Sequence, residues 1–546
     1  MLHNILQVVQ AAIALSIAWV LGRMARSHLT YARLRKLRGP QSMSLMTGNL
    51  KQWFARDGDA FQRHVALDYG SVVKIHGMMG RPILYVSDPW ALHSILIKEE
   101  PIYQPSKAFI EMAHILFGPG LLATRGIPHS RQRKLLNPVF SINHMRRMLP
   151  IFYDVVYKLQ DAMRTTIEGG KSETDILGWT VRVALELIGQ GGLGCSFDPL
   201  VEERREPFAD AIKAFNPTMV RLAVIRRFIP YVQVLGPPWF RRKVVELLPK
   251  TTIIRQVHDI VDTINSRAAQ IYEGKKAVLQ QGDEAVIEQL GEGKDLIGIL
   301  MRANMAVDET ERLPEDEVVA QISTFVFAAL ETTSTTLARI LHLLSMNQDV
   351  QRKLREELLE ARAVEGISYD ELDSLPLLDS VCRETLRLYP PATNIVRVAQ
   401  EDNIVPLSQP ITTSDGRTLT ELFVPQGTEI LIGTYASNVN KDLWGPDALE
   451  WKPQRWSQLP SAVTDARIPG VYSNLLTFLA GKRACIGFKF SEMEMKVVLA
   501  VLLTHFTFDL TEKPIVWNVA AIRYPTVGKE STRPEMPLKV GIYRSA

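Results

Sequence analysis

Cysteine is scarce in this chain. The 546 residues include three cysteines, Cys195, Cys382 and Cys485, and no CxxC pair. This spacing excludes a disulfide-stapled secreted protein and favours a reducing compartment. The chain also has no Asn-x-Ser/Thr glycosylation site with an allowed middle residue, which supports a cytosolic location for its body.

A strong net charge is also missing. The formal net charge is +4, and the apolar and charged fractions are ordinary for a globular protein. This composition indicates neither disorder nor a repeat class. A charge this mild and this dispersed gives no reason to expect a nucleic-acid partner, so we predict none.

No acidic residue precedes Asp57, and residues 2–22 carry no charge apart from a titratable His3. A run of about 20 apolar residues can span a bilayer as a helix. Basic residues, which stay on the cytoplasmic side of a membrane, follow this run: Arg23, Arg26, Arg33, Arg35, Lys36 and Arg38. We therefore predict a transmembrane anchor at residues 1–22, a basic hinge with a proline at residues 23–45, and a cytosolic domain at residues 46–546. A cleaved signal peptide is the alternative, but the basic n-region of such a peptide is missing.

The hydrophobic pattern predicts one large, mainly helical domain with small β-sheets. Residues 71–77 and 81–88 are typical of a strand pair, and helical patterns dominate from about residue 105 to 346. Residues 313–346 are apolar on most sides, which predicts a helix in the middle of the protein. Residues 273–294, which are charged and contain glycine, are predicted to form a surface loop.

One glycine-rich stretch is misleading. The residues GQGGLG at 189–194 have the spacing of the dinucleotide-binding fingerprint G-x-G-x-x-G. That fingerprint requires a strand before it and a helix directly after it. The preceding residues read as a helix instead, so we interpret the stretch as a helix end followed by a loop.

The stretch FLAGKRACIG at residues 478–487 places Cys485 between two glycines. A zinc site needs three or four ligands, and no histidine lies nearby to activate the thiol as a nucleophile. A single thiolate ligand is what one kind of haem requires. Gly481 and Gly487 allow a close approach of the backbone to a porphyrin, and Arg483 can pair with a propionate. The amides that begin the helix predicted after residue 487 are expected to lower the pKa of the thiol.

This stretch resembles the haem-binding loop of the cytochrome P450 monooxygenases, F-x-x-G-x-R-x-C-x-G. Other blocks resemble family motifs in the family's order: HSRQR at 129–133, AALETT at 328–333, ETLR at 384–387 and PQRW at 453–456. The resemblance implies the cytochrome P450 fold and haem b (iron protoporphyrin IX) with Cys485 as axial ligand of the iron. It also implies a cofactor-binding set made up of Phe478, Gly481, Arg483, Cys485, Gly487, His129, Arg133 and Arg397.

The resemblance further implies roles outside the cysteine loop. Glu331 and Thr332 are expected to relay protons during catalysis, and Glu384, Arg387 and Arg455 to form a buried structural network. The sequence departs from the family pattern in carrying Ala329 for the usual glycine, Gln454 for glutamate and His129 for tryptophan. Three regions are expected to contact a lipophilic substrate: residues 101–122 as a lid, the central helix through Ile322, Phe325 and Val326, and residues 393–396.

The overall pattern, including LWGPDALEWKPQRW at residues 443–456, resembles fungal microsomal members of the family. This resemblance implies a single-pass enzyme of the endoplasmic reticulum membrane with its catalytic domain in the cytosol. It would use O2 and NADPH-cytochrome P450 reductase to oxidise a lipophilic small molecule, for example a terpenoid secondary metabolite. A basic docking face is weighed against ordinary solvated cations for six residues: Arg131, Lys134, Arg146, Arg147, Lys482 and Lys489. The alternatives are a haem-thiolate isomerase or dehydratase and a non-catalytic haem- or lipid-binding membrane protein.

Overall fold

The computed structural model describes residue 22, residues 29–198, residues 200, 211, 218 and 232, and residues 236–281, 295–472 and 474–544. Apart from Gly22, the predicted anchor lies outside these residues. No helix among the described residues has both the length and the apolar character needed to cross a bilayer. The chain divides into two compact units, one made of Met1–Gln104 and Asn394–Ser437 and the other of Pro105–Thr393 and Asn438–Ala546. The boundaries predicted at residues 22 and 45 stay predictions.

The first unit contains a mixed five-stranded sheet of order β1-β2-β8-β5-β3. The predicted strand pair is confirmed: β1 and β2 are antiparallel, and β2 then pairs with β8 in parallel. All five residues of β2 are buried, as expected for an apolar strand inside a sheet. The bounds of this sheet and of the β6–β7 hairpin are β1 (Val72–His76), β2 (Pro82–Val86), β3 (Tyr103–Gln104), β5 (Val396–Ala399), β6 (Asn403–Thr412), β7 (Thr418–Val424) and β8 (Glu429–Ile432). The helices here are α2 (Leu50–Trp53), α3 (Asp59–Asp68), α4 (Pro89–His93) and α19 (Thr434–Asn438).

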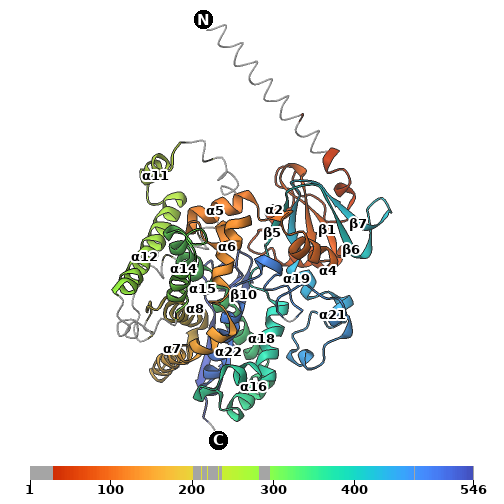
Figure 1. The fold of residues 1–546 in the computed structure, drawn as a ribbon. Helices are drawn as coiled ribbons and strands as arrows, with labels where there is room; N and C mark the ends of the chain where they lie inside the picture. The colour runs from red at the N-terminus through yellow and green to blue at the C-terminus, as the bar shows by residue number, and fades with distance from the viewer. Residues whose placement is uncertain are drawn as a thin grey trace. The chain divides into compact units, whose positions relative to one another are not determined.

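The second unit is built around the long helix α15 (Glu315–Met346). Proline precedes the helix and three acidic residues form its first turn, which suits the positive end of the helix dipole. Most of its residues from Val318 to Ser345 are buried, because α8, α12, α16, α18 and α22 pack around it (Figure 1). The predicted central helix is therefore confirmed.

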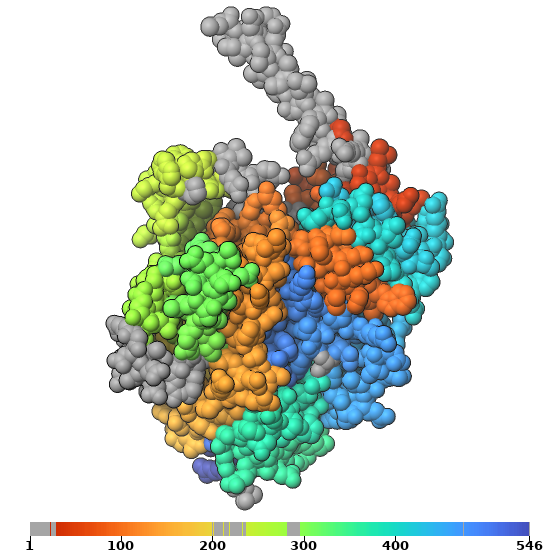
Figure 2. All heavy atoms as spheres, viewed as in Figure 1, coloured from red at the N-terminus to blue at the C-terminus, as the bar shows by residue number. Residues whose placement is uncertain are grey.

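Other helices of the second unit are α5 (Lys107–Phe117), α6 (Gly126–Leu136), α7 (Ile142–Glu168), α8 (Ile176–Leu187), α11 (Pro238–Glu246), α12 (Ile253–Gln281), α14 (Leu296–Ala306), α16 (Gln348–Glu360), α17 (Tyr369–Asp373), α18 (Pro376–Leu388), α20 (Lys441–Trp444), α21 (Ser461–Asp465) and α22 (Phe488–His505). Its strands are β4 (Glu173–Asp175), β9 (Phe506–Asp509), β10 (Ile515–Asn518), β11 (Tyr524–Val527) and β12 (Pro537–Ile542). Figure 2 shows α6 and α7 (orange) at the surface of this unit, beside blue atoms from the C-terminal part of the chain. A mainly helical fold with small sheets is confirmed.

One loop prediction is wrong. Helix α12 continues through residues 273–281, which were expected to belong to a loop. Lysine, alanine, leucine and glutamine dominate this stretch, and their helix propensity outweighs the single Gly274. Residues 282–294 of the predicted loop lie outside the described residues.

The glycine-rich stretch at 189–194 behaves as predicted. It follows α8 directly, as the π-helical turn η5 (Ile188–Leu193) and the left-handed Gly194 at a φ of 64°. With a helix in front of it, the stretch lacks the strand that dinucleotide binding requires.

Candidate active site

The loop from Phe478 to Gly487 folds back on itself. The backbone N–H of Cys485 donates to the carbonyl oxygen of Phe478 at 2.9 Å. Gly481 begins the short helix η10 (Gly481–Arg483) at a φ of 66°, in the left-handed region that glycine adopts easily. Leu479 also has a positive φ, 58°, which a residue with a Cβ keeps only when its surroundings enforce it. No pattern of residue types marks this strained position in the sequence.

Gly487 needs a different explanation from Gly481. It has an ordinary φ of −90° and caps α22. A Cβ added there would meet only the ring of Phe140, at 3.8 Å, which is an ordinary van der Waals contact. Neither the backbone nor the neighbouring protein atoms therefore require glycine here. The reason expected from the sequence, close approach of a group that is not part of the chain, still fits.

The thiol of Cys485 combines exposure with desolvation. Its side chain is exposed, yet burial by the surrounding protein raises the pKa of the thiol above its ordinary value, against the N–H of Gly487 and the charge of Arg133, which lower it. A group has both properties when it faces a recess enclosed by the protein. The amide at the start of α22 lowers the pKa of the thiol, as expected from the sequence, but desolvation outweighs it.

Two arginines lie beside the cysteine loop. Arg133, on α6, donates from Nη1 to the carbonyl oxygen of Ala484 at 2.7 Å. Arg483 donates from Nη2 to the carbonyl oxygen of Thr124 at 3.0 Å. His129, one turn before Arg133 on the same helix, is buried. The structure thus joins α6 to the cysteine loop and brings the two predicted arginines to that junction.

The middle of α15 has a face that is less buried than the rest of the helix; this is called the open face of α15. Ala328 is exposed, and the neighbouring Phe327, Ala329, Glu331 and Thr332 are half-buried, although the turns on either side are buried. Burial raises the pKa of Glu331 from 4.5 to about 8, so this carboxyl is mostly protonated at neutral pH. The hydroxyl of Thr332 donates to the carbonyl oxygen of Ala328 at 2.8 Å. This face therefore presents an acid and a hydroxyl at an opening inside the protein.

The predicted substrate wall on α15 is wrong. Ile322 and Val326 are completely buried, and Phe325 packs edge-to-face against Phe140 at 5.3 Å between ring centroids. Successive residues of a helix are rotated by about 100°, which directs Ile322 and Val326 away from Ala328. Phe325 lies one turn before Ala329, but its ring is buried against Phe140. The half-buried Phe327 lies on the open face, a position that an apolar-all-round helix does not reveal from sequence.

Phe327 connects the open face of α15 to α5. Its ring lies 4.6 Å from that of Phe117, the last residue of α5. Both rings belong to an apolar cluster with residues of α12, among them Ile253 and Val257. Residues 105–122 of the predicted lid, which include α5, thus pack against α15 and α12.

The three residues predicted from ETLR and PQRW to form a structural network, Glu384, Arg387 and Arg455, contact one another. Nε and Nη2 of Arg387 donate to the two carboxylate oxygens of Glu384 at 2.8 Å each, and neither side chain is exposed. Arg455 reaches Glu384 at 3.4 Å. Trp456, which directly follows Arg455 and was not among the predicted site residues, donates from its indole N–H to Glu384 at 3.0 Å. Arg387 also donates to backbone carbonyls of Asn438, Ala448 and Glu450.

Arg397 belongs to the first unit. It lies in β5, is buried, and donates from Nη1 to its neighbour Val396 at 3.1 Å. Its role toward a cofactor stays a prediction.

The cations considered for a docking face are not equivalent. Three of them are held in ion pairs, Arg131 with Glu317, Lys134 with Glu311 and Arg146 with Asp370. Lys482 and Arg147 are exposed, and Lys489 is half-buried with its ammonium 5.5 Å from the centre of the Phe488 ring. Ion pairs within the chain thus reduce the positive potential at three of the six positions.

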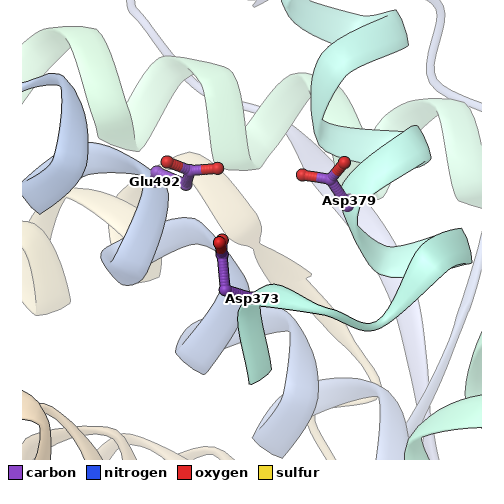
Figure 3. Close-up of side chains that lie close together, drawn as sticks. All are labelled: Asp373, Asp379 and Glu492. Carbon is purple, nitrogen blue, oxygen red and sulfur yellow. The ribbon is translucent and has the colours of Figure 1, made fainter. Parts of the chain in front are cut away.

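A separate carboxylate group has the spacing of metal ligands. Asp373 of α17, Asp379 of α18 and Glu492 of α22 direct their carboxylates toward one another (Figure 3). The ammonium of Lys496 lies among them, 3.0 Å from Asp379 and 3.1 Å from Glu492, and also pairs with Asp373. Burial works against the charge of Lys496, but these carboxylates raise its pKa overall. A cation of the chain itself therefore satisfies this group, and a metal ion is not needed.

The comparisons agree with the motif order. The family model described as Cytochrome P450 matches residues 38–519. The chain belongs to the cytochrome P450 family. It is 57% identical over 536 residues to cytochrome P450 monooxygenase 81 of Postia placenta, with 98% of each chain covered. It is 44% identical over 529 residues to a ganoderic acid synthetase of Ganoderma lucidum, with 96% of each covered. A P450 monooxygenase of Hericium erinaceus is 37% identical, with 97% of each covered.

Membership of the P450 family implies a haem cofactor, and the residues of this site fit one. The exposed but desolvated thiol of Cys485 faces an internal recess, as an axial ligand must. Gly487 leaves room that nothing in the described chain fills. Arg133 and Arg483 supply guanidinium donors beside the loop, suited to carboxylates. The P450 is accordingly a monooxygenase of the fungal type.

Proposed function

We propose that this P450 binds haem b with the thiolate of Cys485 as the axial ligand of the iron. Arg133, Arg483 and His129 would hold the propionates. A role for Arg397 toward the haem stays a prediction from the sequence. Phe478, Gly481 and Gly487 shape the loop that carries the thiol. When bound, the haem supplies a redox-active iron, and its thiolate ligand favours cleavage of the O–O bond. The observation that carries this proposal is the exposed side chain of Cys485 within a desolvating environment.

Glu331 and Thr332 are the proposed catalytic residues. Because the pKa of Glu331 is about 8, its carboxyl holds a proton at neutral pH and can donate it. Thr332 commits its own hydrogen to Ala328, so its oxygen remains able to accept a hydrogen bond. In this arrangement Glu331 holds the proton and Thr332 orients the acceptor that receives it.

The substrate is proposed to be a lipophilic small molecule, such as a terpenoid of secondary metabolism. Phe117 and Phe327 supply an apolar wall beside Glu331, and a mostly apolar lining suits such a ligand. The name of the Ganoderma relative, which refers to the synthesis of ganoderic acid, supports an oxidation of this kind.

The N-terminal sequence supports a proposal for the cellular setting. We propose a single-pass anchor at residues 1–22, a hinge at residues 23–45 and a catalytic domain at residues 46–546 in the cytosol at the endoplasmic reticulum membrane. Electrons would come from NADPH through a separate P450 reductase on the same membrane. The exposed Lys482 and Arg147 are the cations best placed to attract an acidic partner, because neighbouring carboxylates compensate Arg131, Lys134 and Arg146.

The deciding experiment is the carbon monoxide difference spectrum of the dithionite-reduced protein. We expect a strongly red-shifted Soret band in the wild type and in Cys195→Ala, and no such band in Cys485→Ala. A band at the position of histidine-ligated haem in the wild type would contradict the axial ligand. A folded, haem-supplied wild type without haem absorbance would contradict the proposal as a whole.

A further inference from the structure

Gln132 is a completely buried polar residue between two proposed haem-binding positions, His129 and Arg133, on α6. Its amide nitrogen donates to the carbonyl oxygen of Pro119 at 2.8 Å and to Oε2 of Glu317 at 2.7 Å. Its amide oxygen accepts from the hydroxyl of Thr124 at 3.3 Å. One side chain therefore links α6, the first turn of α15 and the segment between α5 and α6.

That segment, residues 118–124, is fastened elsewhere as well. The N–H of Leu121 donates to Oε1 of Gln321 on α15 at 3.1 Å, and the carbonyl oxygen of Thr124 accepts from Arg483 of the cysteine loop at 3.0 Å. Gly120 lies so close to α15 that a Cβ would come within 2.8 Å of Oγ1 of Thr324. The segment is thus held between α15, α6 and the cysteine loop.

The segment also sets the position of α5. Helix α5 ends at Phe117, directly before residue 118, and Phe117 packs on Phe327 at the open face of α15. A shift of residues 118–124 would therefore move this aromatic wall. The same shift would disturb the bond between Thr124 and Arg483.

Glu317, in the first turn of α15, accepts a hydrogen bond from the amide of Gln132. Its two carboxylate oxygens are both used, one by Gln132 and the other by Arg131, at 2.7 Å each. Its backbone carbonyl accepts from Gln321 at 3.2 Å, and Gln321 in turn holds Leu121. Because a charged acceptor makes a stronger hydrogen bond than a neutral one, Glu317 fixes the orientation of the Gln132 amide.

We propose that Gln132 is a positioning residue that sets the apolar wall over the active site. Through residues 118–124 it keeps Phe117 against Phe327 while holding the segment in register with Arg483. The inference rests on the proposed function, since it assumes that the recess beside Cys485 holds haem. It goes beyond that function in assigning an effect on the accepted ligand size to Gln132, a residue that contacts neither the ligand nor the haem.

The test compares two azoles that bind haem iron, imidazole and 4-phenylimidazole, by titrating the Soret shift of the haem-loaded protein. Imidazole is too small to reach far from the iron, whereas the phenyl ring needs a formed wall. We expect Gln132→Met to weaken 4-phenylimidazole by about ten-fold and to leave imidazole within about two-fold, because a displaced wall loses apolar contact with the phenyl ring, a contact that imidazole does not make. Glu317→Gln, which keeps an uncharged acceptor for Gln132, should show a smaller loss of the same kind.

Gln351→Met is the matched control. Gln351 is equally buried and donates to Leu344 and Phe508, but none of its partners lies in α5, α6 or the cysteine loop. Gln351→Met should lower the melting temperature about as much as Gln132→Met and leave both azole affinities unchanged.

Equal azole affinities in Gln132→Met and wild type would overturn the proposal and leave Gln132 a stabilising residue alone. If Gln132→Met does not fold, Glu317→Gln decides: unchanged selectivity between the azoles overturns the proposal. Loss of the proposed function would look different, because the wild type itself would then give no Soret shift.

Discussion

Arg387 and Glu384 form a bidentate ion pair from which water is excluded, with two hydrogen bonds of 2.8 Å and no exposed atom in either side chain. Removing Arg387 takes away the bidentate partner of a buried carboxylate and leaves Arg455, at 3.4 Å, as the cation that opposes its charge. Arg387→Met should therefore lower the free energy of unfolding by about 3–5 kcal/mol.

A urea titration of the haem-loaded protein measures this loss. The control is Arg352→Met, which removes the exposed pair of Arg352 with Glu356 on α16 and should cost at most about 1 kcal/mol. Losses of equal size in the two variants would show that the Glu384 network does not act as a buried brace.

Glu331 should make the stability of the protein depend on pH. Its pKa is raised from 4.5 to about 8, so between these values the folded protein holds a proton that the unfolded chain has released. Stability then falls as the pH rises through this window. Glu331→Gln removes this effect because a glutamine does not titrate. We therefore expect the free energy of unfolding of the variant, relative to that of the wild type, to be higher at pH 8 than at pH 5, as measured by urea unfolding at the two pH values.

Glu371→Gln is the control of opposite sign. The carboxylate of Glu371 accepts from the backbone and hydroxyl of Ser368, which lowers its pKa. Its removal should destabilise the protein at neutral pH and lose that effect in acid. A difference between Glu331→Gln and wild type that does not change with pH would contradict a buried neutral carboxyl at this position.

The two glycines of the cysteine loop should respond differently to alanine. Gly481→Ala forces a Cβ into a left-handed backbone and should cost about 1 kcal/mol in stability with or without haem. Gly487→Ala meets only Phe140, at 3.8 Å, and should leave the apoprotein as stable as the wild type. Its haem affinity should fall by about ten-fold or more because the methyl overpacks the recess. Full haem uptake by Gly487→Ala, measured by Soret absorbance, would contradict close approach of haem there.

Phe325 and Phe327 provide a contrast within one helix. Phe325→Ala removes a buried ring packed on Phe140 and should cost about 3–5 kcal/mol of unfolding free energy. Phe327→Ala should cost less, because its ring is half-buried, but should change which azoles or substrates the site accepts. Soret titrations and thermal unfolding of both variants check this division. If Phe325→Ala alone changed the ligand preference, the assignment of the open face of α15 would be wrong.

Local patterns and ordered motifs predicted much of this molecule. The β1–β2 pair, α15, α22 and the Glu384–Arg387 pair all follow from short sequence stretches whose residue types restrict the backbone or the partner. The properties that the sequence did not predict depend on which other parts of the chain surround a residue. A helix that is apolar on most sides does not show which side faces a recess, so Phe327 was missed and Phe325 was chosen. The pKa of Cys485 depends on how many protein atoms exclude water, which a motif does not contain.

The Gln132 network illustrates the same limit. Its members come from residues 119–132, 317–321 and 483, and only the fold brings them together. A glutamine in a basic helix carries no sign of burial in the sequence. Its three hydrogen bonds become visible only with the coordinates of its partners.

Lys496 gives the junction of α17, α18 and α22 a counterion that is encoded in the gene. A site of three carboxylates filled from solution would depend on the supply of a divalent ion, empty on dilution and fail in the presence of a chelator. The ammonium of Lys496 is covalently part of the chain, so every molecule has it and it does not exchange with ions in solution. The helix that follows Cys485 is therefore held at this point by a cation of the chain itself, independently of calcium or magnesium.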